Sequence, residues 1–150
     1  MNRIEHNGKS YTDSDIVSAE LFSELSPISE TLGYGTFNAV VKSETTAILN
    51  YTANTPLQYY YNGNLFATYY VNRIVRQGKN KYAIAAYDII GVLSKQQHMG
   101  GIYNGTTAAT LLASIIGTTF DYTVAANVQS VLVYGWLPYA TARENLHTLL

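Results

Sequence analysis

The sequence predicts an α+β protein, in which an antiparallel, barrel-like β-meander is followed by a small αβ unit. Three strand-like runs joined by tight-turn residues occupy 57–87, and after Asp88 the period of the apolar residues changes from two to that of a helix. The chain has 150 residues, of which 47% are hydrophobic, so it can build one ordinary domain or two small units. We place a β-rich domain at residues 1–98 and the αβ unit at residues 99–150.

Two strands are predicted before the meander. Residues 17–21 and 37–41 alternate apolar with polar side chains, which is the pattern of a half-buried strand. The apolar positions are Val17, Ala19 and Leu21 in the first run and Phe37, Ala39 and Val41 in the second. Pro27 and the Gly-Tyr-Gly segment at 33–35 indicate a loop between the two strands.

The meander begins with the clearest local signal in the chain. Residues 57–61 and 65–71 are rich in aromatic and β-branched side chains, and Asn62 and Gly63 stand between them. Asn-Gly adopts positive φ at low cost, so it suits the primed turn that matches the twist of paired strands. A second turn is expected at 77–80. The strand before it runs through Val71, Arg73 and Val75, and the strand after it returns through Tyr82, Ile84 and Ala86.

Helical patterns dominate the rest of the chain. A short helix is expected over 89–93, and Thr106 or Thr107 can cap a helix that runs to Ile116, with Gly117 at its C-terminal end. The apolar stripe of that helix is Ala108, Leu111, Leu112, Ile115 and Ile116. Short strands are expected at 120–124 and 131–134.

The last element is a helix that begins with a capping box, formed by Thr141 and Glu144. Its apolar stripe is Ala142, Leu146, Leu149 and Leu150, and no C-terminal capping residue follows. We therefore expect the αβ unit to be truncated at this helix.

The chain contains few charged residues, and this favours some classes of function over others. Charged residues make up 13% of the chain, about half of the usual roughly 25%, and the net charge is −1. A surface of Tyr, Thr, Ser and Asn can be covered by another subunit at little desolvation cost, so assembly is favoured. No basic block exists to neutralise phosphates, and no apolar run is long enough to cross a bilayer, so nucleic-acid binding and membrane insertion are not expected.

Tyrosine supplies the candidate binding residues. The chain holds 14 tyrosines, and Tyr59, Tyr60, Tyr61, Tyr69 and Tyr70 cluster on the first hairpin of the meander. Tyr gives a large contact area at low entropic cost, so a protein interface is favoured, with sugar binding second. The candidate interface residues are Tyr59, Tyr61, Tyr69 and the single tryptophan, Trp136, for which packing in the core is an equal alternative.

Catalytic and metal sites receive little support. The segment from Gly100 to Thr107 has the glycine spacing of a phosphate-binding loop but lacks its lysine, so a structural corner is favoured. His6, His98 and His147 have no ligand spacing, and each is expected at the surface or an interface. The chain has no cysteine, and nothing selects the carboxylate pairs Asp13 with Asp15 or Glu20 with Glu24 for glycosidase chemistry. We expect no catalytic residue, no metal and no cofactor.

Several blocks in order resemble one protein family. YDIIGVLSK at 87–95, GGIYNGTT at 100–107 and YGWLPYATARENL at 134–146 are similar to the N-terminal region of tail hub and minor structural proteins of phages and prophages of Gram-positive bacteria. The meander, with its Asn-Gly hairpin, and Pro27-Ile28-Ser29 between the first two strands are similar to the same proteins. The resemblance covers nearly the whole chain.

The resemblance implies a structural part of a phage-type tail, in the baseplate hub or the tail tip, and not an enzyme. Family members form rings, often trimers, so it implies a homo-oligomer that also contacts other tail or baseplate proteins. The protein would lie in the virion tail and in the host cytoplasm during assembly. The first alternative is a carbohydrate-binding or adhesin module that contacts the host surface. The second is an enzyme that acts on the cell wall.

Overall fold

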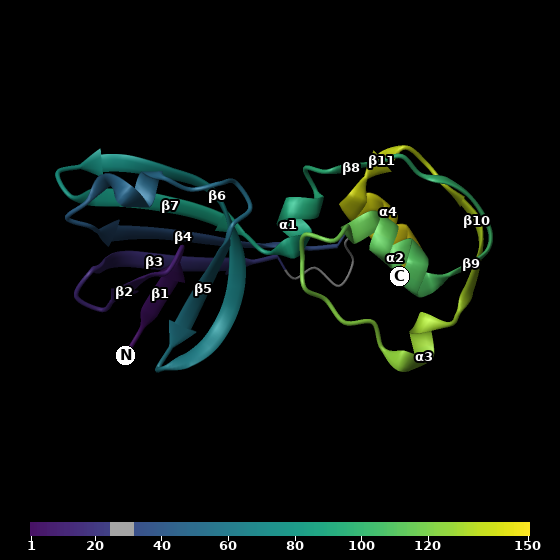
Figure 1. Ribbon diagram of the computed structural model, residues 1–150, viewed down its shortest axis with the longest axis horizontal. Helices are drawn as coiled ribbons and strands as arrows, with labels where there is room; N and C mark the ends of the chain where they lie inside the picture. Colours follow the sequence, from purple (N-terminus) through teal and green to yellow (C-terminus); the bar gives the residue numbers. More distant parts are fainter. Residues whose placement is uncertain (25–31) are drawn as a thin grey trace. The chain divides into compact units, whose positions relative to one another are not determined.

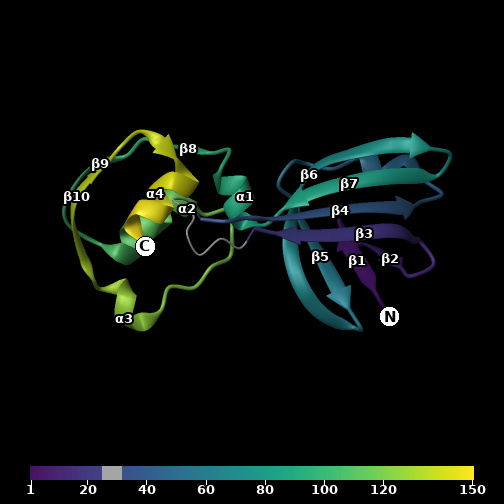
Figure 2. The same ribbon diagram turned by 180° about the vertical axis from the view of Figure 1, so that it is seen from behind.

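The computed structural model describes residues 1–24 and 32–150 (Figures 1 and 2). The chain divides into two compact units. The first comprises the described N-terminal residues and Gly33–Val92, and the second comprises Leu32 and Leu93–Leu150. The loop expected at Pro27 and the segment 27–29 of the family resemblance lie outside the described residues.

The first unit is built on one antiparallel sheet of seven strands, in the order β2-β1-β5-β6-β7-β4-β3. The strands are β1 (Arg3–His6), β2 (Lys9–Thr12), β3 (Ile16–Ser23), β4 (Gly35–Lys42), β5 (Pro56–Tyr61), β6 (Asn64–Gly78) and β7 (Lys81–Tyr87), with a 3-10 helix, η1 (Thr46–Leu49), between β4 and β5. β5, β6 and β7 are consecutive neighbours, which confirms the predicted meander. Together with the helices of the second unit, the sheet confirms the α+β class.

The sheet curves strongly but does not close. β6 pairs with β5 through Asn64–Tyr70 and with β7 through Tyr70–Gly78, and Figure 1 shows how sharply this strand bends. The terminal strands, β2 and β3, do not pair with each other among the described residues, so the expected barrel is an open sheet. One reason lies at the end of β2, where the Thr12 N–H donates to the Asp15 carboxylate in the turn, 3.0 Å away, instead of to a neighbouring strand.

The core of the first unit lies on the inner side of this curved sheet. The predicted apolar faces of β4 (Phe37, Ala39, Val41) and β7 (Tyr82, Ile84, Ala86) are all buried. In β6, by contrast, Val71 is buried while Arg73 and Val75 are exposed, and Ile74 takes the inward position. A β-bulge between Val71 and Arg73 inserts one residue and shifts the alternation by one place.

β3 forms as expected but is mostly exposed. It pairs only with β4, so it is an edge strand of the sheet. Val17 and Leu21 are 47% and 40% exposed, whereas Ala19 packs against the core. The alternation in the sequence therefore marks the strand correctly, but an edge strand buries less of each side chain than a central strand does.

The second unit consists of two small two-stranded sheets and helices. β8 (Gln97–His98) pairs with β11 (Ala140–Thr141), and β9 (Gly101–Thr107) pairs with β10 (Leu132–Leu137). Its helices are α2 (Ala108–Ile116), α3 (Ala126–Gln129) and α4 (Ala142–Leu149), and the short helix α1 (Ile89–Leu93) follows β7 with all but its last residue in the first unit. Figure 2 shows α2 and α4 beside each other, and the two helices are in contact.

Both main helices begin where the sequence predicts. The Thr107 hydroxyl accepts the Thr110 N–H at 3.3 Å, and all five predicted stripe residues of α2 are buried. Thr141 and Glu144 form the complete capping box of α4. Gly117 ends α2 with φ +78°, a value that favours glycine, although its ψ of −170° lies outside the left-handed helical region.

Two local predictions for this unit are wrong. The segment 101–107, expected as part of a corner, is strand β9, because its backbone groups pair with β10; the turn is confined to Gly100, whose φ is +67°. Residues 120–124 form no strand, since only Phe120 is buried there, and the side chains that follow it are not held against a neighbouring strand.

Candidate functional site

The four candidate interface residues separate into two pairs. Tyr59 and Tyr69 are each 7% exposed and belong to the core of the first unit. Their rings lie 5.3 and 5.2 Å from the Phe37 ring, measured between centroids, so they pack inward and present little surface to a partner. Burial raises the pKa of both phenols. Tyr61 and Trp136 are 54% and 67% exposed and remain candidates.

Tyr61 lies at the tip of the β5–β6 hairpin. Asn62 and Gly63 form the turn with φ of +49° and +83°, as the Asn-Gly signal predicts. Leu65 and Phe66 follow on β6 and are more than half exposed. The tip therefore presents apolar and aromatic side chains. The sequence around it, from Glu44 to Arg73, contains no charged residue between these two.

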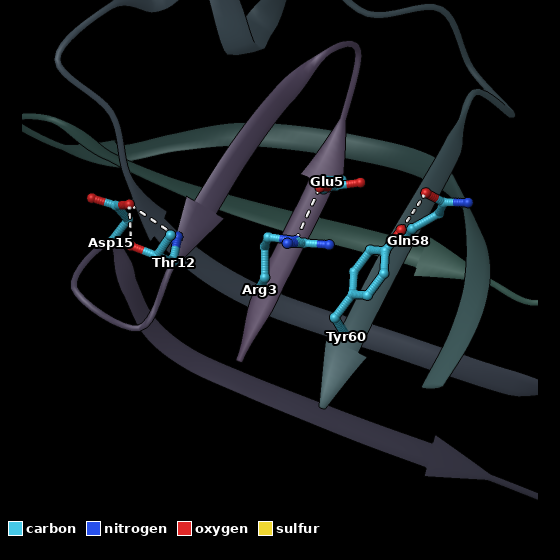
Figure 3. Close-up of polar contacts among 6 residues, drawn as sticks. All are labelled: Arg3, Glu5, Thr12, Asp15, Gln58 and Tyr60. Atoms are coloured by element: carbon cyan, nitrogen blue, oxygen red, sulfur yellow. Dashed lines mark hydrogen bonds and ion pairs between the residues drawn. The ribbon is translucent and has the colours of Figure 1, made fainter. Parts of the chain in front are cut away.

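Beside this hairpin, the outer face of β1 and β5 is covered by polar contacts (Figure 3). The Arg3 guanidinium lies 4.1 Å from the centroid of the Tyr60 ring, and its Nε forms an ion pair with Glu5 at 2.9 Å. The Tyr60 hydroxyl donates to Gln58 Oε1 at 3.1 Å. The Arg3–Tyr60 contact joins β1 to β5, while the Arg3–Glu5 and Tyr60–Gln58 contacts each lie within one strand.

In the second unit, two strongly exposed aromatic residues, Tyr134 and Trp136, lie on the β9–β10 pair. Trp136 is directly opposite Ile102, and Tyr134 is opposite Asn104. Ile102 is 85% exposed and Tyr134 66%, and both lie on the same face as Trp136. The sequence interpretation singled out Trp136 alone, because it treated 100–105 as a corner; reading Ile102 and Asn104 as alternate residues of a strand would have found the rest of the face.

The polar cluster that most resembles a catalytic group is His98, Asn145 and Ser114, and its hydrogen bonds are structural. His98 Nδ1 accepts from the Gly100 N–H at 3.3 Å and from Asn145 Nδ2 at 2.8 Å. Because Nδ1 accepts, the proton sits on Nε2, which is 3.5 Å from Ser114 Oγ. A protonated Nε2 cannot take a proton from the serine, whose hydroxyl donates to the Leu111 carbonyl at 2.8 Å.

Of the other residues singled out in the sequence, His6, Asp13 and Asp15 make structural contacts. His6 is expected at the surface or an interface, but it is buried, because it lies on β1, which has a neighbouring strand on each side. Its Nδ1 lies 3.1 Å from the Pro56 carbonyl oxygen. Asp13 accepts the Asn2 N–H, and Asp15 accepts from Thr12, so both carboxylates hold backbone near the β2–β3 turn. Across 1–24 and 32–150, no three His, Asp or Glu side chains gather as metal ligands.

No helix in the described part of the chain is long and apolar enough to span a membrane.

No family profile and no curated protein matches its sequence. Its fold matches those of several solved structures, among them two tail proteins. The 43 kDa tail protein of prophage MuSo2 from Shewanella oneidensis has a TM-score of 0.57 and 16% identity, and the match covers 99% of this chain and 48% of that one. The tail protein from Neisseria meningitidis MC58 has a TM-score of 0.56 and 14% identity, over 97% of this chain and 43% of that one.

The chain shares the fold of these two tail proteins. It spans just under half of their length. At these identities the likeness establishes the fold, whereas the Gram-positive host and the hub position implied by the sequence resemblance stay predictions.

Proposed function

We propose that the protein is a structural component of a phage-type tail. The observation that carries the proposal is that both units together, 99% and 97% of the chain, follow the fold of two tail proteins from different organisms. A match to one unit alone would be weaker support, because a small sheet or helix pair recurs among unrelated proteins.

The position we propose is the baseplate hub or the tail tip, where the protein assembles with copies of itself, as a trimer, and with other tail or baseplate proteins. Its surface supports self-assembly. Tyr61, Leu65, Phe66, Tyr134 and Trp136 are all more than half exposed, and none lies in a charged segment. Covering such a surface removes few ions from water, so association costs little desolvation energy.

The role that we propose is mechanical and involves no catalytic step, cofactor, nucleic acid or membrane insertion. The curved sheet of the first unit supplies a stiff wall, because its strands are joined by hydrogen bonds along their length. The second unit supplies a further surface for neighbouring subunits.

The test is to purify tail particles from cells that produce them together with this protein, and to ask whether the particles contain the protein. Mass spectrometry of purified particles should find the protein at a fixed ratio to the other tail proteins. Electron microscopy of the gene deletion should show missing or incomplete tails. Intact, full-length tails that lack the protein would contradict the proposal.

A further inference from the structure

The outer face of the β9–β10 pair is an organised apolar surface, which we call the ribbon face. It consists of Ile102, Leu132, Tyr134 and Trp136, with Asn104 between them. Ile102 is 85% exposed, Trp136 67%, Tyr134 66% and Leu132 52%. The residues that alternate with them, such as Val133 and Leu137, turn toward the helices and are less exposed.

The geometry of the two strands keeps these side chains together. Trp136 is paired with Ile102, and Tyr134 with Asn104, so each pair projects from the same side of the ribbon. A bulge at Gly105, with φ +80°, restores the alternation farther along β9. The Tyr134 ring lies across this glycine: a Cβ there would come within 3.4 Å of the Tyr134 hydroxyl oxygen. The Tyr134 ring therefore packs against the backbone of β9.

The exposed area matches the apolar part of a protein interface. A large side chain that is fully open to solvent exposes on the order of 150–250 Å², so the four exposed fractions amount to roughly 500 Å². A standard interface buries about 800 Å² on each partner, of which about 65% is apolar in homo-oligomers, or about 500 Å². The ribbon face alone is thus large enough to form the core of a stable interface.

Charge indicates what can cover this surface. β9 and β10 contain no Lys, Arg, Asp or Glu, so a charged partner would lose hydration without gaining a counter-charge. The chain itself offers uncharged stretches between Glu44 and Arg73, between Lys95 and Asp121 and between Asp121 and Arg143. A second copy therefore presents the kind of surface that the ribbon face requires.

We propose that the ribbon face is an assembly surface that a second copy of this chain covers, with Trp136 at its centre. The inference rests on the proposed self-association of the protein, and it adds which surface is used. Trp136 and Tyr134 are residue types that concentrate binding energy at interfaces, because they bury a large area with few rotatable bonds.

Trp136 is the single tryptophan of the chain, so its fluorescence reports directly on this surface. Sedimentation velocity of the full chain over a range of concentrations gives the association midpoint. On association the tryptophan emission should move to shorter wavelength and become less accessible to iodide, with the same midpoint. If the protein associates while Trp136 stays as accessible to iodide as in the monomer, the ribbon inference is wrong, although self-assembly stands.

A substitution tests the same surface independently. Ile102→Lys places a charge opposite Trp136 and should weaken association at least tenfold; because Ile102 is 85% exposed, circular dichroism and thermal unfolding should be unchanged. Phe22→Lys is the matched control, since Phe22 is 64% exposed on β3 in the first unit, and this variant should associate like the unsubstituted chain. If Phe22→Lys weakens association and Ile102→Lys does not, the inference is wrong. A chain that stays monomeric at all concentrations also overturns it, whereas the tail role itself depends on whether the protein is found in tail particles.

Discussion

Asn145, which is buried, and His98, which is partly buried, illustrate how a few polar groups organise the second unit. Asn145 is fully buried, and its amide nitrogen donates to the Pro138 carbonyl at 3.0 Å as well as to His98 Nδ1. These bonds tie α4 to β8 and to the turn before β11. The capping residue Thr141 could be recognised from the sequence alone, because its partner Glu144 is three residues away; the partners of Asn145 are distant in the chain and could not.

The His98 contacts predict a pH dependence. Burial lowers the pKa of the His98 imidazole below its ordinary value of about 6.5. The unfolded chain therefore binds a proton more readily than the folded one, so stability should fall as the pH drops below 6.5 toward the lowered pKa. Thermal unfolding between pH 7.5 and 5 should show this loss. His98→Gln, which cannot titrate, should reduce the slope over this range; an unchanged slope would contradict the assignment.

Phe37 is the residue on which the aromatic core of the first unit depends. It is fully buried, and the rings of Tyr59 and Tyr69 pack against it. Phe37→Ala should lower the free energy of unfolding by about 3–5 kcal/mol, because it removes the ring and leaves a cavity. Phe22→Ala, at an exposed position, should change it by less than about 0.5 kcal/mol. Urea denaturation of both variants gives the comparison, and equal effects would show that Phe37 is not central to the core.

At the scale of elements, turn residues predict the local structure more reliably than the alternation of apolar residues predicts which face of a strand is buried. The Asn62-Gly63 turn is formed as predicted, since both residues must adopt positive φ for a two-residue hairpin. The pattern of β6 fails beyond Val71, because the bulge that shifts its alternation leaves no residue signal in the sequence. β9 was not predicted, because Gly100, Gly101 and Gly105 suggested a corner, whereas the pairing of β9 with β10 depends on a strand about thirty residues later in the chain.

The β5–β6 hairpin provides a test of the turn. Gly63 has φ +83°, so Gly63→Ala should cost about 1–2 kcal/mol of stability, although a Cβ there would meet no neighbouring atom. Gly78 is a matched control, because its φ is not positive and its surroundings are equally open; Gly78→Ala should be neutral or slightly stabilising. Chemical denaturation measures both. A loss at Gly78 as large as that at Gly63 would show that backbone conformation is not the cause.

At the scale of the whole molecule, the low charge predicts how association responds to salt. The exposed apolar surfaces described above, the tip of the β5–β6 hairpin and the ribbon face, contain no charged residue of their own strands, so self-association through them should not depend on ion pairs. Raising the salt concentration from 0.05 to 1 M, which shortens the screening length severalfold, should leave the association constant unchanged or increase it. Sedimentation equilibrium at both concentrations tests this. A steep loss at high salt would instead indicate an interface held by charge.

The sequence by itself determined the α+β class, the meander, the helix α2 with its buried stripe, and the cap at Thr141, because each depends on residues within a few positions of one another. It left the cap of α2 open between Thr106 and Thr107, and the structure places it at Thr107. Only the tertiary structure decided that the sheet stays open, that β3 is an exposed edge, and that Tyr59 and Tyr69 are core residues while Tyr61 and Trp136 face solvent. The physical reason is that the burial of a strand residue depends on what packs over it, here Phe37 of β4 or the helices of the second unit, and those groups are far away in the chain.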